Sequence, residues 1–338
     1  MSWTPRQRLA AVLAGEPADR PLVSLWRHCR EAEYPGGPLA EWTIEFARRW
    51  EWDWIKLNPR ATYYGEIWGN QYRDGDYEQR DIPRQIKIAV NRLDDLDTIE
   101  TIPDSPVLAE QVQLTREVAA AIPQTPVFQT LFSPVSTLIQ LAGLSYYPGK
   151  PVFGLTGQLS LRELFTADRE RTARALQAIT STYLWYLDQL RAAGADGVFY
   201  AVTATANPQI MSAELFDELS APYDRQLMEA AGELAVIVHT CGDHSDPGRF
   251  TGWGSAVSWD QYADGNPPLD GLDKTVVVGG VDHRRFAETE LVAAQTAAAA
   301  ELARTRPVLV APTCSVHSTA ATDASLEALV SACRKPAE

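Results

Sequence analysis

The sequence contains little cysteine, no long apolar run and no excess of positive charge. Its four cysteines, Cys29, Cys241, Cys314 and Cys333, are too few and too scattered to form a disulfide framework. No apolar stretch approaches the roughly 20 residues that span a bilayer. The N-terminal segment also lacks the sustained apolar region and cleavage site of a signal peptide. We therefore expect a cytoplasmic protein that does not enter a membrane.

The charge balance excludes two further classes of partner. Acidic residues outnumber basic ones, and the formal net charge is −14 at pH 7. Such a surface does not favour non-specific binding to nucleic acid or to anionic membranes. Hydrophobic residues make up 45% of the 338 residues, which is enough to bury the core of one large α/β domain or of two smaller domains. The net negative charge also gives no long-range attraction to a polyanionic substrate, although a local basic pocket could still bind one.

Short apolar runs alternate with helical patterns along the chain. Segments 169–195, 212–234 and 289–306 show helical periodicity or helix-forming composition. Eight runs predict strands, at 21–26, 52–58, 125–132, 196–202, 234–241, 255–260, 275–282 and 306–314. This alternation favours a parallel (β/α)8 TIM barrel, with a doubly wound open sheet as the alternative. Residues 59–124 are longer than an ordinary connection, so we expect an insertion between the second and third strands.

Two side chains with affinity for metals end the fifth predicted strand. Because side chains alternate along a strand, His239 and Cys241 of the motif "HTC" point to the same face. They lie at the carboxyl end of the strand, where barrel enzymes place their active sites. Cys314 ends the eighth predicted strand in the same way. One imidazole and two thiols with a fourth position open are typical of a catalytic zinc site. The alternative is that these cysteines belong to the core, where free cysteine is often buried.

Four segments together resemble a known family. They are "TPRQRLAAVLAGEPADRP" (4–21), "HTCGD" (239–243), "GGVD" (279–282) and "APTC" (311–314). The sequence resembles the uroporphyrinogen decarboxylase superfamily, most closely its branch of zinc-dependent, corrinoid-linked methyltransferases. It departs from the family pattern at the last turn, where Thr313 and Ser315 flank the cysteine in place of glycine.

The resemblance implies one TIM-barrel domain over residues 1–338 in which His239, Cys241 and Cys314 hold zinc. It implies transfer of a methyl group from a methylated corrinoid to a small thiol, activated as a zinc-bound thiolate. The methyl donor is expected to be either methylcobalamin or a separate corrinoid protein. A thiol is mostly protonated at neutral pH, and binding to zinc removes its proton.

Other polar residues at predicted strand ends are candidates for the site. Asp260, after the sixth strand, is a candidate fourth zinc ligand, or else an ordinary strand-end carboxylate. His28, Arg27, Lys56 and Asn207 are candidates for substrate binding, although each also fits a satisfied polar residue of the rim. Alternation places His28 on one face of the first strand and Arg27 on the other.

Two other functions stay open at this stage. One is metal-free decarboxylation of a carboxylated tetrapyrrole in porphyrin biosynthesis, which requires Arg27, Arg30 and Lys56 to converge in a basic pocket. The segments "LWRHCREAEY" (25–34) and "IKLNP" (55–59) depart from the motifs that true uroporphyrinogen decarboxylases carry there. The other is a non-catalytic barrel that binds a corrinoid or another small molecule, for which replacement of Cys314 by serine would be harmless.

Overall fold

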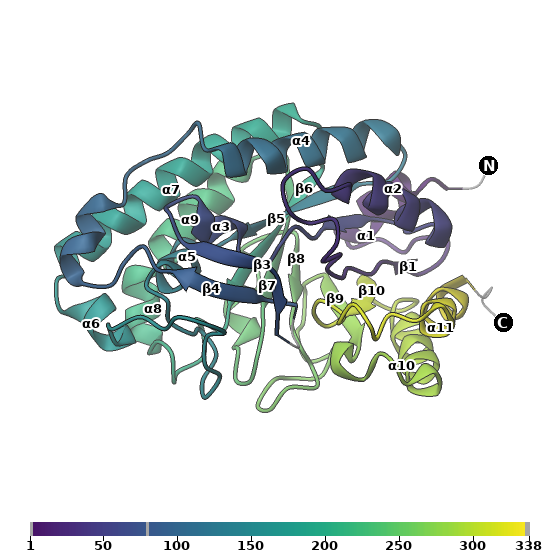
Figure 1. Cartoon of the computed structure of the whole chain (residues 1–338). Coiled ribbons are helices and arrows are strands. Elements are labelled where there is room, and N and C mark those ends of the chain that lie inside the picture. Colours follow the sequence, from purple (N-terminus) through teal and green to yellow (C-terminus); the bar gives the residue numbers. More distant parts are fainter. Residues whose placement is uncertain (1–2, 79–80, 335–338) are drawn as a thin grey trace.

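A single sheet of eight parallel strands forms the centre of the computed structural model, which describes residues 3–78 and 81–334 (Figure 1). Neighbouring strands follow the order β1, β10, β9, β8, β7, β6, β5, β2. Their bounds are β1 Leu22–Val23, β2 Ile55–Leu57, β5 Val127–Phe132, β6 Gly197–Thr203, β7 Ala235–Thr240, β8 Ala256–Ser258, β9 Val277–Val281 and β10 Val308–Pro312. Seven lie within a predicted run and β6 extends one residue beyond its run, because buried parallel strands read as short apolar stretches.

The first and last strands of this order lie side by side. The N–H of Asp53, just before β2, donates to the carbonyl of Val23 in β1 at 3.0 Å. The hydroxyl of Ser24 donates to the carbonyl of Trp54 at 2.6 Å. The sheet therefore curls round on itself, and the fold is a (β/α)8 barrel. The alternative of a doubly wound open sheet is wrong.

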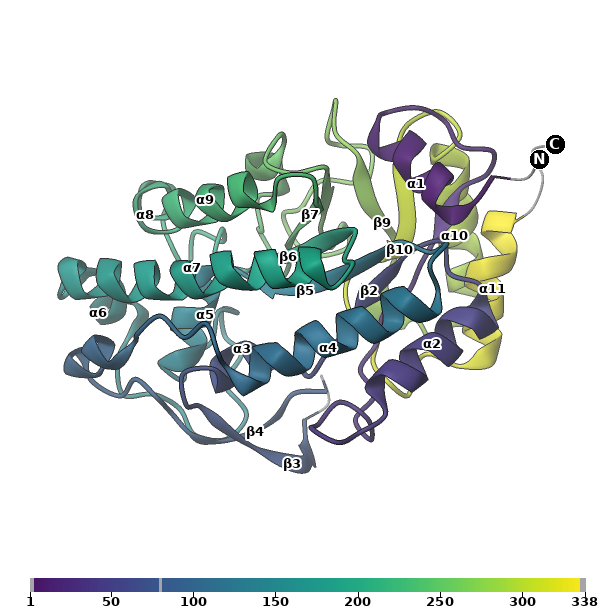
Figure 2. The same ribbon diagram turned by 90° about the horizontal axis from the view of Figure 1, so that it is seen from above.

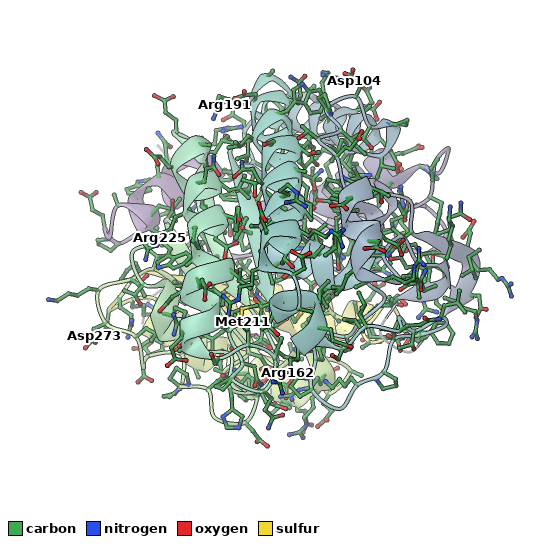
Figure 3. The ribbon with its side chains drawn as sticks, turned by 90° about the vertical axis from the view of Figure 1, so that its left-hand side faces the viewer. Asp104, Arg162, Arg191, Met211, Arg225 and Asp273 are labelled. Atoms are coloured by element: carbon green, nitrogen blue, oxygen red, sulfur yellow. The ribbon has the colours of Figure 1, made fainter. Side chains whose placement is uncertain are left out.

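Helices surround the barrel, with both chain ends on the same side (Figures 1 and 2). They are α1 Pro5–Leu13, α2 Leu39–Trp50, α3 Tyr63–Glu66, α4 Pro106–Ala121, α5 Pro134–Leu141, α6 Leu161–Thr166, α7 Arg169–Ala192, α8 Ala213–Leu219, α9 Ala221–Ala231, α10 Thr289–Leu302 and α11 Asp323–Arg334. Short 3-10 helices cover Leu93–Thr98, Pro247–Phe250 and His283–Arg285. Figure 3 faces α7 and α9, where exposed Arg191 and Arg225 extend from the outer surface. Among the described residues, no helix is both long and apolar enough to cross a membrane.

The segment 212–234, predicted as one helix, contains two helices that meet at Ser220. Pro222 lies in the first turn of α9, where its missing N–H costs no hydrogen bond. The Ser220 hydroxyl donates to the carboxylate of Asp224 at 2.7 Å, which holds the new helix start. A proline inside an apparent helical pattern was the signal for this break.

The long connection between β2 and β5 combines an added hairpin with an ordinary barrel helix. The antiparallel strands β3 Gln71–Tyr77 and β4 Pro83–Lys87 form the hairpin, which projects from the barrel in Figures 1 and 2. Helix α4 then leads back to β5, as the helix of any β/α unit does. Asp81 of the hairpin accepts hydrogen bonds from the Arg30 guanidinium and from the backbone and hydroxyl of Ser318. The hairpin is thereby fastened over the loops that follow β1 and β10.

Large aromatic side chains fill the inside of the barrel. Trp26, Trp54, Phe128 and Phe199 pack together, with ring centroids 5.1 to 5.8 Å apart. Helix α1 adds its apolar face to the same cluster at the amino end of the strands. The aromatic layer thus fills the amino-terminal part of the barrel interior, and the open space lies beyond it, at the carboxyl ends of the strands.

Candidate functional site

A cavity of about 700 Å³ opens above the aromatic layer. Trp26 and Phe199 form its floor, and side chains from the carboxyl ends of the strands form its wall. The residues that carry ionisable or thiol groups there are His28, Lys56, Arg60, Asp81, Tyr146, Tyr147, Lys150, His239, Cys241, Asp243, Asp260, His283, Arg284, Cys314 and His317. This is the end of the barrel at which TIM-barrel enzymes carry out their chemistry.

His239, Cys241 and Cys314 meet in the wall of this cavity. His239 and Cys241 come from the end of β7, and Cys314 comes from the turn after β10, three places away in the sheet. The Sγ atom of Cys314 lies 3.8 Å from Nε2 of His239. The two thiols are close enough to shift each other's pKa. On the other side of the ring, Nδ1 of His239 lies 3.1 Å from the hydroxyl of Ser258 in β8. That contact fixes the ring and turns Nε2 towards the thiols.

A tyrosine from the loop after α5 completes this group. The hydroxyl of Tyr147 lies 2.9 Å from the sulfur of Cys241. Gly242 follows this cysteine with a φ of +83°, a conformation that favours glycine. The glycine of the motif "HTCG" therefore allows the chain to turn after β7, beside the tyrosine.

The two thiols differ in acidity. The hydrogen bond from the Cys241 thiol lowers the pKa of Cys314 well below its usual range, and the His239 imidazole adds to this effect against the influence of burial. The same hydrogen bond, together with burial, raises the pKa of Cys241. A thiolate is the form that binds metal and acts as a nucleophile, so Cys314 is the first of the pair to offer one.

Lys56, at the end of β2, is buried just above the aromatic floor. Its amine lies 5.5 Å from the centre of the Trp26 ring and 4.9 Å from that of Phe199. It donates to the side-chain carbonyl of Asn58 at 2.5 Å. Burial lowers the pKa of Lys56 to about 7, although the nearby Cys314 acts in the opposite direction. A cation at this position lies within the electrostatic reach of the thiol group.

Asp260 lines the cavity beyond the end of β8. One carboxylate oxygen accepts the N–H of Tyr262 at 3.0 Å, and the other lies 3.5 Å from the guanidinium of Arg284 and 4.0 Å from Nδ1 of His283. Its charge is close enough to Cys241 to raise the pKa of that thiol. The carboxylate is therefore near the thiols and already partnered by a cation.

Two of the candidates for substrate binding, and a further arginine that the decarboxylase alternative requires, do not line the cavity. Arg27 points outward, with its guanidinium 4.9 Å from the centre of the Trp42 ring. Asn207 is buried in the loop after β6, where its amide donates to the carbonyl of Asp243 at 2.6 Å. Arg30 is bound to Asp81. Of the three cations that a decarboxylase pocket required, only Lys56 lines the cavity, so the converging basic pocket is not formed.

Sequence reasoning missed Tyr147, and it missed Ser258, whose hydroxyl orients the His239 ring. The pair "YY" at 146–147 is followed by proline and glycine, which marks a turn but not the cavity that the turn reaches. Ser258 shares its strand face with Asp260, and strand alternation gave a signal for it.

Among residues 3–78 and 81–334, no group of three or more His, Cys, Asp or Glu side chains already has an arrangement that could hold a metal ion. The donor chemistry nevertheless fits zinc: one imidazole with its second nitrogen engaged, and two thiols that shift each other's pKa.

Comparison with known proteins identifies the family to which this barrel belongs. The family model of uroporphyrinogen decarboxylase (URO-D) matches residues 4–336. The chain belongs to this family, as the motifs predicted.

The relatives that match are methyltransferases. The methylcobamide:CoM methyltransferases MtbA of Methanosarcina mazei and Methanosarcina acetivorans are 22% and 20% identical over 302 residues, and each match covers 83% of both chains. A solved methyltransferase structure from Methanosarcina mazei superposes with a TM-score of 0.77 at 19% identity, covering 98% of each chain. A B12-independent methionine synthase from Shewanella sp. W3-18-1 gives a TM-score of 0.52 at 11% identity, covering 93% of this chain and 97% of the other. These structural likenesses concern the fold.

Proposed function

We propose that this protein is a zinc-dependent methyltransferase that moves a methyl group from a methylated corrinoid to a small thiol. The observation that carries the proposal is the meeting of His239, Cys241 and Cys314 in one cavity of a URO-D family barrel. Relatives named as methylcobamide:CoM methyltransferases support the same reaction class. The methyl donor is methylcobalamin or a separate corrinoid protein.

The three donors have separate tasks in this proposal. His239 is oriented by Ser258 and presents Nε2 as the nitrogen ligand. Cys241 and Cys314 supply the sulfur ligands, with Cys314 ionising first. Bound zinc would lower the pKa of the acceptor thiol and hold it in the remaining coordination position. Asp260 is the candidate for that position in the absence of substrate, since its carboxylate already acts on Cys241.

The remaining cavity residues position the reactants. The cavity takes a small thiol at the zinc ligands with room above it for the methyl donor. Lys56 offers a cation to the developing thiolate or to an anionic group of the acceptor, because no carboxylate is paired with its amine in the described part of the chain. The hydroxyl of Tyr147, 2.9 Å from the sulfur of Cys241, would donate a hydrogen bond to that sulfur once it is a thiolate and so stabilise it.

The direct test is a methyl-transfer assay with zinc-loaded protein. Methylcobalamin is the donor, and CoM, 2-mercaptoethanol and cysteine are offered in turn as acceptors. We expect the cobalamin absorption spectrum to change as the methyl group leaves and a methyl thioether to appear in equal amount by mass spectrometry. A loaded protein that transfers no methyl group to any of these thiols, from methylcobalamin or from a methylated corrinoid protein, would contradict the proposal.

Removal of the hydroxyl that orients His239 should weaken the metal site without abolishing it. We expect Ser258→Ala to lower zinc affinity by about 10- to 100-fold, because partners of ligating histidines contribute that much. Competition with a zinc chelator of known affinity measures the change. Ser331→Ala, on the outer helix α11, is the matched control and should bind zinc like the wild type. Equal affinities in both variants would show that Ser258 does not support a ligand.

A further inference from the structure

A second histidine in the cavity wall is held by a buried carboxylate. Nδ1 of His28 lies 2.9 Å from Oε2 of Glu33, whose side chain is fully buried. The other oxygen of Glu33 accepts a hydrogen bond from the hydroxyl of Tyr77 in β3 at 3.0 Å. None of these residues is a candidate metal ligand. The added hairpin thus supplies Tyr77, the first member of a hydrogen-bonded series of three residues that ends with His28 at the cavity.

The hydrogen-bonded series Tyr77–Glu33–His28 determines which nitrogen of His28 faces the ligand. An ionised carboxylate only accepts hydrogen bonds, so Nδ1 carries the ring hydrogen and Nε2 carries the lone pair. His28 lines the cavity, and no residue that the structure describes forms a hydrogen bond with its Nε2. The geometry is that of an oriented base, in which the carboxylate also stabilises the imidazolium formed when Nε2 takes a proton.

His28 also lies on the side of the cavity that carries the proposed sulfur ligand. The loop after β1 runs parallel to the turn after β10, where Arg27 pairs with Val316 and the N–H of Val316 donates to the carbonyl of Trp26 at 3.1 Å. Cys314 stands two residues before Val316. The base and the candidate ligand therefore project from adjacent chain segments into the same space.

From this geometry we propose that His28 is the catalytic residue that takes the proton from the acceptor thiol, with Glu33 and Tyr77 as positioning residues. The inference rests on the proposed function. The S–H bond breaks, its proton passes to Nε2, and sulfur keeps the electron pair. That pair forms the bond to the methyl carbon, while the cobalt–carbon bond breaks and leaves its electron pair on cobalt. The imidazolium then returns the proton to water.

Lys56 is another base that lines the cavity, and its surroundings suit a different task. Its amine lies against two aromatic rings and donates to Asn58, and within residues 3–78 and 81–334 no carboxylate is paired with it to stabilise a gained charge. His28 has such a carboxylate in direct contact. This difference assigns proton removal to His28, and it leaves Lys56 to attract the developing thiolate or an anionic group of the acceptor.

The test compares His28→Gln, which preserves bulk and a hydrogen bond to Glu33, with His28→Ala, which leaves space for an external base. Zinc-loaded proteins are assayed with methylcobalamin and CoM, or with the acceptor found for the wild type. We expect kcat to fall at least a hundredfold in both variants, as for loss of a general base, with bound zinc unchanged. Added imidazole should restore His28→Ala at least tenfold and leave His28→Gln unaffected. Glu33→Gln should lower kcat about tenfold.

A spectroscopic measurement tests the dyad without turnover. The long-range ¹⁵N–¹H correlation spectrum of the wild-type protein, assigned by difference from His28→Gln, should show His28 with hydrogen on Nδ1 only. Hydrogen on Nε2 instead would overturn the inference. So would a kcat within threefold of the wild type in both variants, or a loss in His28→Ala that imidazole does not restore. Absence of methyl transfer by the wild type itself would overturn the proposed function, and this inference with it.

Discussion

Replacing Cys314 by serine is expected to lower kcat for methyl transfer by about 10³-fold or more. The reason is that a hydroxyl does not replace a thiolate as a ligand for zinc, and the several kcal/mol that a Lewis acid contributes to the transition state are lost with the metal. Cys314 is the thiol whose pKa the site lowers, so its removal also takes away the most readily formed thiolate. The measurement is the initial rate of methyl-thioether formation at saturating thiol.

Cys333→Ser is the matched control for this substitution. Cys333 is buried in α11, outside the cavity, and its loss makes the same chemical change without touching the site. We expect this variant to keep kcat within about twofold. If Cys314→Ser also kept its activity, Cys314 would not be a ligand that the reaction needs, and the zinc mechanism proposed for this site would be wrong.

Replacing Lys56 by methionine is expected to stabilise the metal-free protein by up to about 4 kcal/mol near pH 7. Burial lowers the pKa of Lys56 from 10.5 to about 7. At pH 7 the unfolded chain therefore holds this proton more firmly than the folded chain, and the wild type loses stability for that reason. Methionine fills the same space above Trp26 and Phe199 with no charge to desolvate.

The pH dependence gives the sign of this effect. Between pH 7 and pH 10.5 the unfolded state binds more protons at this position, so wild-type stability rises with pH across that window. The advantage of Lys56→Met should therefore shrink towards zero above about pH 10.5, and stay constant below pH 7. Urea unfolding at several pH values measures it, with the exposed Lys150→Met as control. A difference that does not change with pH would mean that Lys56 is hydrated in the folded state.

The fold was predictable because apolar strand runs alternate with helical segments along the sequence. The strand-end residues were predictable because side chains alternate between the two faces of a strand. Buried strands read as apolar runs, and every second side chain near their carboxyl ends faces the barrel interior. This logic places His239 and Cys241 together, and it also separates His28, which lines the cavity, from Arg27, which points outward. Arg27 was kept as a candidate because its charge suited a substrate, but the face of the strand decides its position.

The partners of these residues were not predictable because they come from loops. Tyr147 follows α5, and Tyr77 belongs to a hairpin that ordinary barrels lack. Neither segment has a periodic pattern that fixes its direction relative to the strands. The break at Ser220 had a local signal in Pro222, whereas the contact of Glu33 with His28 depends on a turn whose shape only the structure gives.

The zinc content of the purified protein tests the central claim most directly. The wild type, Cys241→Ser and Cys314→Ser are prepared under reducing conditions, reconstituted with zinc, freed of loosely bound metal and measured by elemental analysis. The account predicts about one zinc per chain in the wild type and almost none in either variant. A wild-type protein without zinc, or variants that retain it, would contradict the assignment of His239, Cys241 and Cys314 as the metal site.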